Sequence, residues 1–300
     1  MSSTLRMRHL DVLLAVAAEG SMQRAAQRVH LTQPAISKLV RELEAMFGAP
    51  LFDRTKRGVT LTECGRALAI RAEYLRNDIE HARDEVAAIS QGTLGSLRIG
   101  ALPVAESALL PQSLMALRKI APALRIRVQE GTSAALLDQL RRGEVDCVIG
   151  RLDSGANGKD IRAEKLTRLP TRIVARRRHP LAARKRVTSE QLAAYPWVLP
   201  QPGAPIRTVI DGVFAAAGIA APIPLVESTS IRLNYELMRS SDMIGVMPDD
   251  AASAYEAVRT LAILPFELGD RLPFVGVMTR TAPPSHALTL FLRVLRESCG

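Results

Sequence analysis

The sequence is poor in cysteine and contains no long apolar run, no internal repeat and no low-complexity tract. Its three cysteines, Cys64, Cys147 and Cys299, lie far apart and form no CxxC pair. Their odd number and wide spacing exclude a disulfide scaffold and a zinc finger, so we expect neither a metal site nor another cofactor. No apolar stretch reaches the roughly 18–20 residues that a membrane span requires, which excludes an integral membrane protein.

What is present indicates a globular protein with more than one domain. A chain of 300 residues with 47% hydrophobic and 23% charged residues is typical of two folded domains, or of a small domain and a larger one. The formal net charge is +10, from 40 Lys and Arg against 30 Asp and Glu. This excess favours polyanions as partners but carries no information about the fold.

The first apolar stretch, residues 10–18, has two interpretations. Basic residues precede it and small residues end it, as in a secretory signal. However, the stretch is short and contains Asp11, and its apolar residues repeat from Leu10 to Ala17 with the spacing of one helix face. We therefore expect an amphipathic helix in a cytoplasmic protein.

Three zones of the chain differ in pattern. Residues 1–62 contain short helical patterns, and residues 63–91 contain no proline and a single glycine. Residues 92–300 alternate β-branched runs with helical runs and begin with a candidate linker, GTLGS. The expected fold class is α/β overall, with an all-α N-terminal domain, a long linking helix and a C-terminal α/β domain.

Three short helices are predicted within residues 7–48. The first ends at Gly20, and Ser21 caps the second. Thr32 caps the third, in which Pro34 occupies the first turn. One face of this third helix is apolar, and the other carries side chains that bind base edges and phosphates, namely Gln33, Ser37, Lys38 and Arg41. A short helix, a tight turn and a longer polar helix predict a helix-turn-helix motif.

A basic hairpin is predicted directly after these helices. Two short β-like runs between residues 49 and 62 flank a turn that ends in Gly58. The cations Arg54, Lys56 and Arg57 are either solvated or in contact with phosphates or the minor groove. Beside a helix-turn-helix motif, we favour a DNA-contacting wing.

Together these residues resemble the LysR-type transcriptional regulators. The shared pattern includes Ser21-x-x-x-Ala25-Ala26, His30-Leu31-Thr32-Gln33-Pro34-Ala35-x-Ser37, Leu43-Glu44, Pro50-Leu51-Phe52, Arg54 and Leu61-Thr62-x-x-Gly65. Lys38 stands where arginine is also common in such proteins, and lysine lacks the two-pronged contact that arginine makes with guanine. The expected winged helix-turn-helix binds DNA through Ser21, Thr32, Gln33, Pro34, Ser37, Lys38, Arg41, Arg54, Lys56 and Arg57.

Residues 63–91 predict one long helix with a heptad seam. The apolar positions step alternately by four and three between Leu68 and Ile89. Such a stripe packs either on its own domain or against a second chain, and the charged remaining faces favour the second chain. The resemblance likewise implies a homodimer or tetramer formed through this helix. The expected dimerisation residues are Leu68, Leu75, Ile79, Val86 and Ile89.

The rest of the chain predicts a parallel sheet covered by helices. Strands are expected near residues 97–100, 124–128, 145–150, 171–175 and 243–247, and helices near residues 106–120 and 133–142. The resemblance implies a two-lobed effector domain similar to a periplasmic solute-binding protein. The expected domains are residues 1–62, 63–91 and 92–300, with lobe one at about 92–162 and 266–300 and lobe two at about 163–265.

A ligand cleft is expected where the strands of this domain end, because ligands bind there in open α/β sheets. The expected effector-binding residues are Pro103, Val104, Thr132, Ser133, Arg151, Pro202, Gly203 and Pro248. The hydroxyls of Thr132 and Ser133 can donate, and Arg151 can pair with a carboxylate or phosphate, of which we favour a carboxylate. In the alternative interpretation, the glycines and prolines only shape loops and the hydroxyls only cap a helix. Short stretches of this domain also resemble members that control aromatic-acid or sugar catabolism.

Some residues fall outside these motifs. The basic clusters Arg176–His179 and Arg184–Arg186 form either a solvated turn or a contact with DNA that passes the dimer. Cys147 lies in an apolar run and is expected in the core. The histidines are scattered, and the sequence contains no evident nucleophile–base pair.

The sequence therefore predicts a cytoplasmic LysR-type regulator that is not an enzyme. We expect it to bind double-stranded promoter DNA, and we expect a small carboxylate effector to shift its contacts with DNA and RNA polymerase. One alternative is a solute-binding transport component, which leaves the pattern in residues 33–62 unexplained. Two others are an enzyme that uses the cleft and a nonspecific architectural DNA-binding protein.

Overall fold

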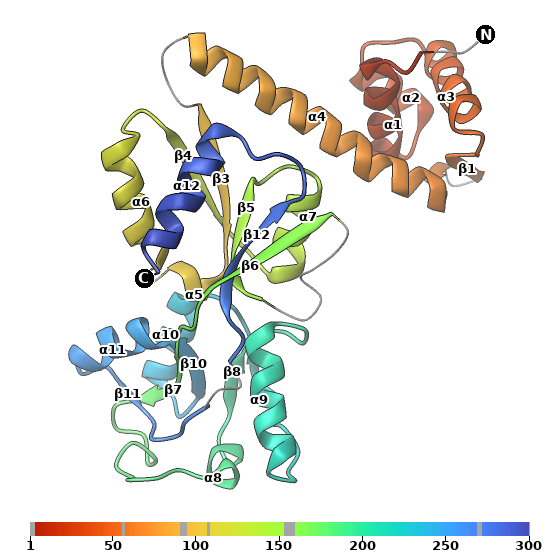
Figure 1. The fold of residues 1–300 in the computed structure, drawn as a ribbon. Coiled ribbons are helices and arrows are strands. Elements are labelled where there is room, and N and C mark those ends of the chain that lie inside the picture. Colours follow the sequence, from red (N-terminus) through yellow and green to blue (C-terminus); the bar gives the residue numbers. More distant parts are fainter. Residues whose placement is uncertain are drawn as a thin grey trace. The chain divides into compact units, whose positions relative to one another are not determined.

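The computed structural model describes residues 4–55, 58–90, 95–106, 109–152, 160–268 and 272–299. The chain divides into two compact units (Figure 1). The first consists of residues 1–91 and 141–144, and the second of residues 92–140 and 145–300. Within the described residues, no helix combines the length and the apolar character that crossing a membrane requires.

Three helices enclose the core of the N-terminal domain: α1 (Met7–Glu19), α2 (Met22–Arg28) and α3 (Gln33–Phe47). Leu13, Ile36 and Leu43 are completely buried between them. α1 and α3 end at Gly20 and Gly48, whose backbone is left-handed, with φ of 59° and 64°. Glycine adopts this conformation without the steric cost that a β-carbon adds, so both helices end where the sequence predicts.

The connections between these helices follow the predicted plan with one exception. Ser21 precedes α2 and its hydroxyl accepts a hydrogen bond from the backbone N–H of Arg24, at 3.4 Å. Thr32 is the N-cap residue of α3, as predicted, but its side chain makes no capping hydrogen bond with the part of the chain that is described. Pro34 instead fixes the first turn of α3, where the missing N–H costs little.

The predicted hairpin forms from β1 (Phe52–Thr55) and β2 (Gly58–Leu61), which pair antiparallel. The backbone N–H of Val59 donates to the carbonyl oxygen of Gly20 at 3.0 Å, so the hairpin lies against the turn after α1. A β-carbon at Gly58 would come within 2.6 Å of the same oxygen, which explains the glycine. The hairpin is thus part of the N-terminal domain and not a detached arm.

The chain then turns sharply into the long helix α4 (Glu63–Ser90). The hydroxyl of Thr62 accepts from the N–H of Gly65 at 2.9 Å and donates to the carbonyl oxygen of Pro50 at 2.8 Å. A β-carbon at Gly65 would lie 2.0 Å from the carbonyl oxygen of Leu51. The helix can therefore begin this close to the hairpin only because position 65 is glycine.

Lobe one of the C-terminal domain is a five-stranded sheet in the order β4-β3-β5-β12-β6. Its strands are β3 (Ser96–Ala101), β4 (Arg125–Glu130), β5 (Cys147–Arg151), β6 (Ile161–Thr167) and β12 (Val275–Arg280). Its helices are α5 (Pro103–Glu106), α6 (Leu109–Ile120), α7 (Ser133–Arg141) and α12 (His286–Glu297). The core between α6, α12 and the sheet includes Leu117, Phe291 and Cys147.

Lobe two is a second five-stranded sheet in the order β11-β7-β10-β8-β9. Its strands are β7 (Thr171–Arg176), β8 (Trp197–Leu199), β9 (Val226–Glu227), β10 (Ile244–Pro248) and β11 (Leu261–Ile263). Its helices are α8 (Ser189–Ala193), α9 (Pro205–Ala216), α10 (Ile231–Ser240) and α11 (Asp249–Ala257). Trp197 and Phe214 meet edge to face in its core, with ring centroids 5.9 Å apart.

Both sheets are mixed and not purely parallel, which corrects the prediction. β12 runs antiparallel to β5 and β6, and β7 runs antiparallel to β10 and β11. The reason is the double crossing of the chain between the lobes. β5, β6 and β10 end at the cleft, whereas β7 and β12 begin there, as the pairing of Arg151 with Val275 and of Pro248 with Thr171 shows.

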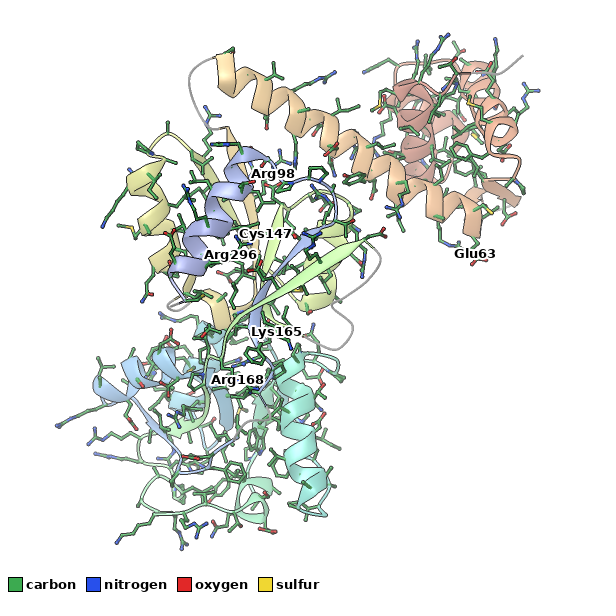
Figure 2. All side chains as sticks on the ribbon, in the orientation of Figure 1. Glu63, Arg98, Cys147, Lys165, Arg168 and Arg296 are labelled. Carbon is green, nitrogen blue, oxygen red and sulfur yellow. The ribbon has the colours of Figure 1, made fainter. Side chains whose placement is uncertain are left out.

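The crossings occur later in the chain than the predicted positions near Arg162 and Phe266. β6 stays in lobe one because it pairs with β12 along its whole length, so the first crossing is at residues 168–170. Leu268 is buried in the core of lobe two, so the return crossing follows it. Where the crossings meet, Lys165 and Arg168 lie over the ring of Phe274, at 5.2 and 4.3 Å (Figure 2).

Candidate functional site

Half of the ten residues that the sequence assigns to DNA contact lie on α3. Ile36, Val40 and Leu43 bury the opposite face. The exposed residues of the predicted set are Thr32, Gln33, Pro34, Lys38 and Arg41, while Ser21 and Ser37 are half-buried. The fold therefore presents a polar, cationic ridge that projects from an apolar core.

The cations on this ridge are held only by weak contacts. The Nζ of Lys38 lies 3.9 Å from a carboxylate oxygen of Glu42, and the Nε of Arg41 donates to the carbonyl oxygen of Ser37 at 3.2 Å. Exposed pairs of this kind contribute about 0.3–0.5 kcal/mol each. Both side chains can therefore leave these contacts for a phosphate or a base edge.

Glu44 has a role in the hairpin that the sequence did not reveal. Its carboxylate accepts hydrogen bonds from the backbone N–H groups of Leu51 and Phe52, at 2.9 and 3.4 Å, and so fixes the start of β1. Of the predicted hairpin cations, Lys56 and Arg57 lie outside the described residues, as does the side chain of Arg54. Their contact with DNA therefore stays a prediction.

The heptad seam of α4 divides into two parts. Ala72 is buried in the N-terminal core and Leu68 packs against it, so the interpretation that the helix packs on its own domain applies to this end. Farther along, the side chains of Leu75, Ile79 and Val86 are 41%, 37% and 68% exposed in the single chain. These three apolar positions are open to a partner helix. The side chain of Ile89 lies outside the described residues.

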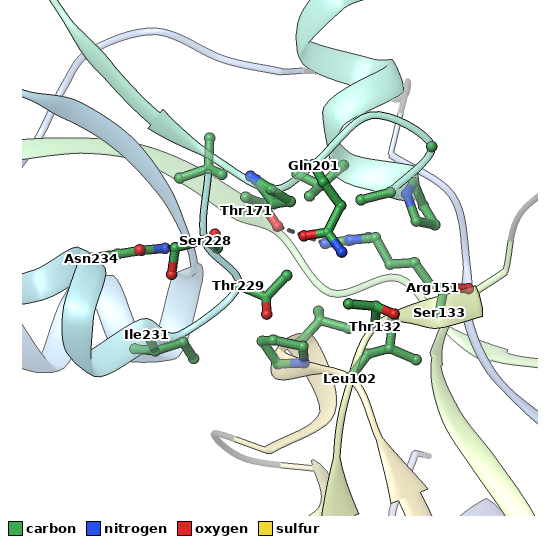
Figure 3. A pocket seen from close by; sticks show the side chains of 18 of the residues that line it. Leu102, Thr132, Ser133, Arg151, Thr171, Gln201, Ser228, Thr229, Ile231 and Asn234 are labelled. Atoms are coloured by element: carbon green, nitrogen blue, oxygen red, sulfur yellow. Dashed lines mark hydrogen bonds between the residues drawn. The ribbon is translucent and has the colours of Figure 1, made fainter. Parts of the chain in front are cut away.

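A cavity of about 300 Å³ lies in the cleft between the two lobes, where the strand ends of both sheets meet (Figure 3). The structure brings all eight predicted effector-binding residues to its wall: Pro103, Val104, Thr132, Ser133, Arg151, Pro202, Gly203 and Pro248. Leu102 extends the apolar lining from lobe one, and Ile206, Ile231 and Met247 extend it from lobe two. The wall is therefore mostly apolar with a few polar groups, as in small-molecule sites.

The alternative role of Thr132 as a helix cap also applies. Its hydroxyl accepts a hydrogen bond from the N–H of Ala135 at 3.3 Å, at the start of α7. The same residue lines the cavity beside Ser133 (Figure 3). Capping and cavity lining thus coincide at one position, because the start of a helix after a strand is also the edge of the cleft.

Arg151 is the last residue of β5, and its side chain connects both chain crossings. Its guanidinium donates to the carbonyl oxygens of Pro273 and Leu169 at 2.9 and 2.6 Å, and to the hydroxyl of Thr171 at 2.7 Å. Leu169 lies on the first crossing and Pro273 on the return crossing. Arg151 therefore fastens the hinge as well as lining the cavity, a role that the sequence did not predict.

The guanidinium of Arg151 is a buried cation without a carboxylate partner in the described part of the chain. The residue is 4% exposed, and burial lowers its pKa to about 10, so it stays protonated at neutral pH. Its three hydrogen-bond acceptors are all uncharged. An uncompensated buried charge is costly, and an anion in the cavity would offset part of this cost.

Asn234 adds a second polar group to the opposite wall. The residue is 6% exposed, and its side-chain N–H donates to the carbonyl oxygen of Ser228 at 3.3 Å. Its Oδ1 is buried and has no hydrogen-bond partner among the described residues. A buried acceptor without a partner costs about 1–3 kcal/mol, so this atom suits a donor group on a ligand.

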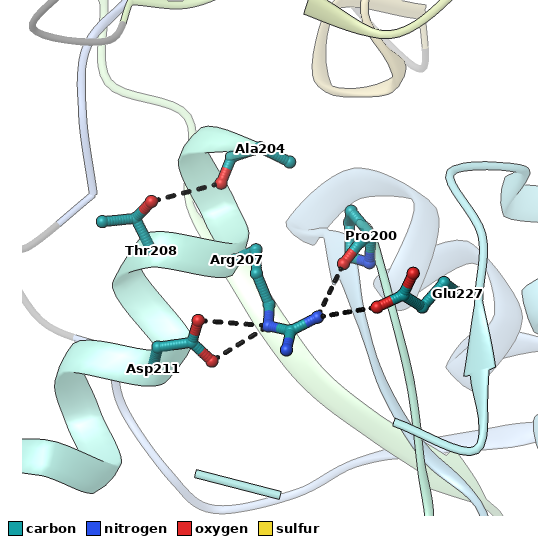
Figure 4. Close-up of polar contacts among 6 residues, drawn as sticks. All are labelled: Pro200, Ala204, Arg207, Thr208, Asp211 and Glu227. Carbon is teal, nitrogen blue, oxygen red and sulfur yellow. Dashed lines mark hydrogen bonds and ion pairs between the residues drawn. The ribbon is translucent and has the colours of Figure 1, made fainter. Parts of the chain in front are cut away.

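Arg207 contacts Pro200, a residue of the lobe-two cavity wall, and two carboxylates (Figure 4). Its Nε donates to both carboxylate oxygens of Asp211, at 2.9 and 3.2 Å. Its Nη1 donates to the carbonyl oxygen of Pro200 at 3.1 Å and approaches Glu227 at 3.5 Å. These bonds connect α9, the loop after β8 and strand β9, so the wall segment that includes Pro202 and Gly203 is held at both ends.

Several polar residues of the cavity were not predicted. They are Thr171, Ser228, Thr229 and Asn234. The prediction considered few strand ends in lobe two, and β9 has only two residues, too few for a recognisable pattern. A polar residue directly after an apolar run of lobe two would have been the signal for Ser228.

The predicted burial of Cys147 is confirmed. The residue lies inside the sheet of lobe one (Figure 2), and burial, together with the nearby charge of Asp146, raises the pKa of its thiol well above the usual value. Within the described residues, no three His, Cys, Asp or Glu side chains lie close enough to hold a metal ion.

Comparisons with known proteins agree with this arrangement. Residues 7–66 match the family described as "Bacterial regulatory helix-turn-helix protein, lysR family", and residues 90–300 match "LysR substrate binding domain". The chain is 30% identical over 297 residues to the HTH-type transcriptional regulator PcaQ of Agrobacterium fabrum, which covers 99% of this chain and 96% of that protein. It is 32% identical over 291 residues to the regulator GalR of Pseudomonas putida, with 95% and 73% of the two chains covered.

Solved structures show the same fold. The crystal structure of CbnR, a LysR family transcriptional regulator, has a TM-score of 0.70 at 21% identity and covers 99% of this chain and 100% of that chain. Full-length CbnR in complex with its target DNA also gives a TM-score of 0.70, at 22% identity, and covers 98% of this chain and 100% of that chain.

Proposed function

This chain belongs to the LysR family of transcriptional regulators, and we propose that its effector is a small amphipathic carboxylate that binds in the cleft. The chain is a DNA-binding regulator with an N-terminal helix-turn-helix and a C-terminal substrate-binding domain. The proposal further assigns DNA contact to the exposed face of α3 and to the hairpin. In it, the effector changes the contacts that the bound regulator makes with promoter DNA and RNA polymerase.

The observation that supports an anionic effector is Arg151 in the cavity wall. It is the single titratable residue among the described residues that line the cavity, and it is a cation. A carboxylate that enters the cavity gains a hydrogen bond from a charged donor, and such bonds are about twice as strong as neutral ones. Among the described residues, this lining contains one cation and no general acid–base pair, and the function that we propose for it is binding.

The rest of the cavity supports the amphipathic part of the proposal. Leu102, Ile206 and Ile231 present apolar surface to the body of a ligand. The Oδ1 of Asn234, which has no hydrogen-bond partner among the described residues, can accept a hydrogen bond from a hydroxyl or amino group at the other end of the ligand. A volume of about 300 Å³ suits a molecule the size of a small aromatic or aliphatic acid.

The test compares matched pairs of ligands on the full-length protein. Each pair consists of a small carboxylic acid and its primary amide, and the readout is the rise in Tm that binding produces. We expect some acids to raise the Tm and their amides to leave it unchanged, because only the acids carry a negative charge that can pair with the Arg151 guanidinium. Amides that stabilise the protein as well as their acids would contradict an anionic effector.

The DNA part of the proposal has a separate test. Footprinting on genomic fragments selected by the protein should show a protected site, and Gln33→Ala should weaken binding to that site by roughly fivefold or more, as expected for a lost base contact. The matched control is Gln112→Ala, an exposed glutamine of α6 that should have no effect. Equal affinities for the selected site and for mixed-sequence DNA would favour an architectural protein instead.

The proposal also includes a dimer formed through α4 and a location in the cytoplasm. Leu75, Ile79 and Val86 supply an exposed apolar seam for pairing two chains through α4, and a symmetric pair matches a palindromic operator. A regulator of promoters works where DNA and RNA polymerase are, so we place it in the cytoplasm. Fractionation of cells that produce the protein, followed by detection of the full-length chain, tests this placement.

A further inference from the structure

A run of cations lies at the end of lobe two opposite the cleft. β7 begins at the cleft with Thr171 and extends roughly 20 Å away from it, at about 3.3 Å per residue. Residues 176–188, which begin with the last residue of β7, connect this strand to α8 (Figure 1). It contains no Asp or Glu, and its cations are Arg176, Arg177, Arg178, Arg184, Lys185 and Arg186. We call residues 176–188 the distal basic segment.

The distal basic segment is firmly anchored to the core of lobe two. His179 is 2% exposed, its Nδ1 accepts from the N–H of Leu181 at 3.1 Å, and its ring packs on Tyr195 with centroids 4.3 Å apart. Leu181 and Val187 are buried in the lobe core. The cations therefore project from a fixed scaffold, so little conformational freedom of the backbone is lost when they bind a partner.

Five of the six cations have no acidic partner in the described part of the chain. Arg176 forms an ion pair with Asp242 at 2.6 Å. The other five are exposed, and they form no ion pair with the described residues. The nearby carboxylate of Glu190 is engaged by the hydroxyl of Thr188. Arg259 adds a further exposed cation, because the neighbouring Thr260 accepts from the N–H of Arg177 at 3.3 Å.

Such a surface fits a polyanion better than a folded protein. A protein interface has an apolar centre, whereas the apolar residues Leu181 and Val187 of this segment point into the core. Like charges this close repel one another, and a row of phosphates compensates several of them at once. The surface is therefore suited to bind regularly spaced phosphates.

We propose that the distal basic segment binds the phosphate backbone of double-stranded DNA outside the site that α3 and the hairpin occupy. The proposal rests on the DNA-binding function of the chain and adds a second, sequence-independent contact. Because the contact is electrostatic, it strengthens DNA binding at every sequence and is highly sensitive to salt.

The test uses the full-length protein and a mixed-sequence duplex of about 60 base pairs, long enough for contacts beyond a single binding site. The variant R177Q/R178Q/R184Q/K185Q/R186Q removes the five exposed cations. The control R118Q/K119Q/R125Q/R127Q/R293Q removes four arginines and one lysine from exposed positions of lobe one, so both variants have the same net charge. Binding is measured by fluorescence anisotropy over a series of salt concentrations.

We expect the slope of log K against log salt to be smaller in magnitude by about 2–4 for the first variant than for the wild type, since each phosphate contact contributes about 0.9 to the slope. Its Kd at physiological salt should rise tenfold or more, while the control should change by less than about twofold. Unchanged urea unfolding of lobe two would show that the substituted residues are not structural.

Equal slopes for both variants and the wild type, with DNA binding intact, would overturn the proposal and leave the regulator function in place. Loss of transcription activation without any change in DNA affinity would also overturn it and would point to an acidic protein partner. Failure of the wild-type protein to bind any DNA would instead contradict the DNA-binding function itself.

Discussion

Replacing Arg151 tests the link between the hinge and the cavity most directly. In Arg151→Met the side chain keeps its length but loses three hydrogen bonds from a charged donor, to Pro273, Leu169 and Thr171. Bonds of this kind contribute about 1.5–3 kcal/mol each, or roughly 4–9 kcal/mol together. Burial of the Arg151 guanidinium offsets part of this hydrogen-bond contribution. The lowering of its pKa to about 10 corresponds to roughly 3 kcal/mol of lost solvation.

For Arg151→Met, these two contributions together predict a loss of about 2–4 kcal/mol in the free energy of unfolding of the C-terminal domain. The loss is smaller than the full hydrogen-bond contribution because water can enter and donate to the acceptors that the arginine no longer contacts. Trp197 is the single tryptophan of the chain and is fully buried in lobe two, so its fluorescence during urea unfolding follows this domain alone. Arg151→Lys should lose nearly as much, because an ammonium cannot reach all three acceptors. The control is Arg232→Met, whose side chain is 81% exposed and should contribute less than about 0.5 kcal/mol.

An unfolding free energy of Arg151→Met within about 0.5 kcal/mol of the wild type would refute the reasoning, since that is the range of ordinary surface substitutions. The same cation sets the pH dependence of effector binding. Because the pKa of Arg151 is lowered only to about 10, the folded protein begins to lose this proton only above neutral pH. Carboxylate affinity should therefore be constant between about pH 6 and about pH 8.5 and fall as the pH rises through 10.

Three further changes have clear expected outcomes. Gly65→Ala should destabilise the N-terminal domain by about 2–3 kcal/mol and weaken DNA binding, because a β-carbon there would overlap a carbonyl oxygen; unchanged DNA affinity would contradict this. In the native protein a thiol reagent should modify exposed Cys64 quickly and buried Cys147 only after unfolding, as timed by mass spectrometry. Ile79→Glu should break the dimer in sedimentation experiments, whereas Ile70→Glu, exposed but off the seam, should preserve it; a dimer in both variants would move the interface elsewhere.

Local patterns in the sequence were sufficient for the N-terminal domain. Gly20, Gly48 and Pro34 mark where its helices end or begin, because each of these residues restricts or relaxes the backbone at one position. The apolar spacing of α3 decides which face is buried, and that in turn decides which polar side chains are exposed. Thr32 is at the predicted N-cap position, but proline in the first turn organises the helix there without a side-chain capping hydrogen bond among the described residues.

The sequence likewise indicated which loops line the cleft, because ligand-binding loops follow strands in α/β sheets and strands are visible as apolar runs. All eight residues chosen on that basis line one cavity. It did not indicate Asn234, whose side chain lies on a helix and reaches the cavity only after the lobes have folded.

The sequence by itself determined the helix-turn-helix, the long helix, the α/β class of the C-terminal domain and the excess of cations, because each depends on neighbouring residues or on composition; its two lobes were expected only from the family resemblance. Tertiary structure alone decided the rest. It set the antiparallel strands, since these depend on where the chain crosses between lobes, and it placed Arg151 on carbonyls more than a hundred positions apart in the chain. Contacts between distant segments follow from packing in three dimensions, and no periodicity along the chain encodes them.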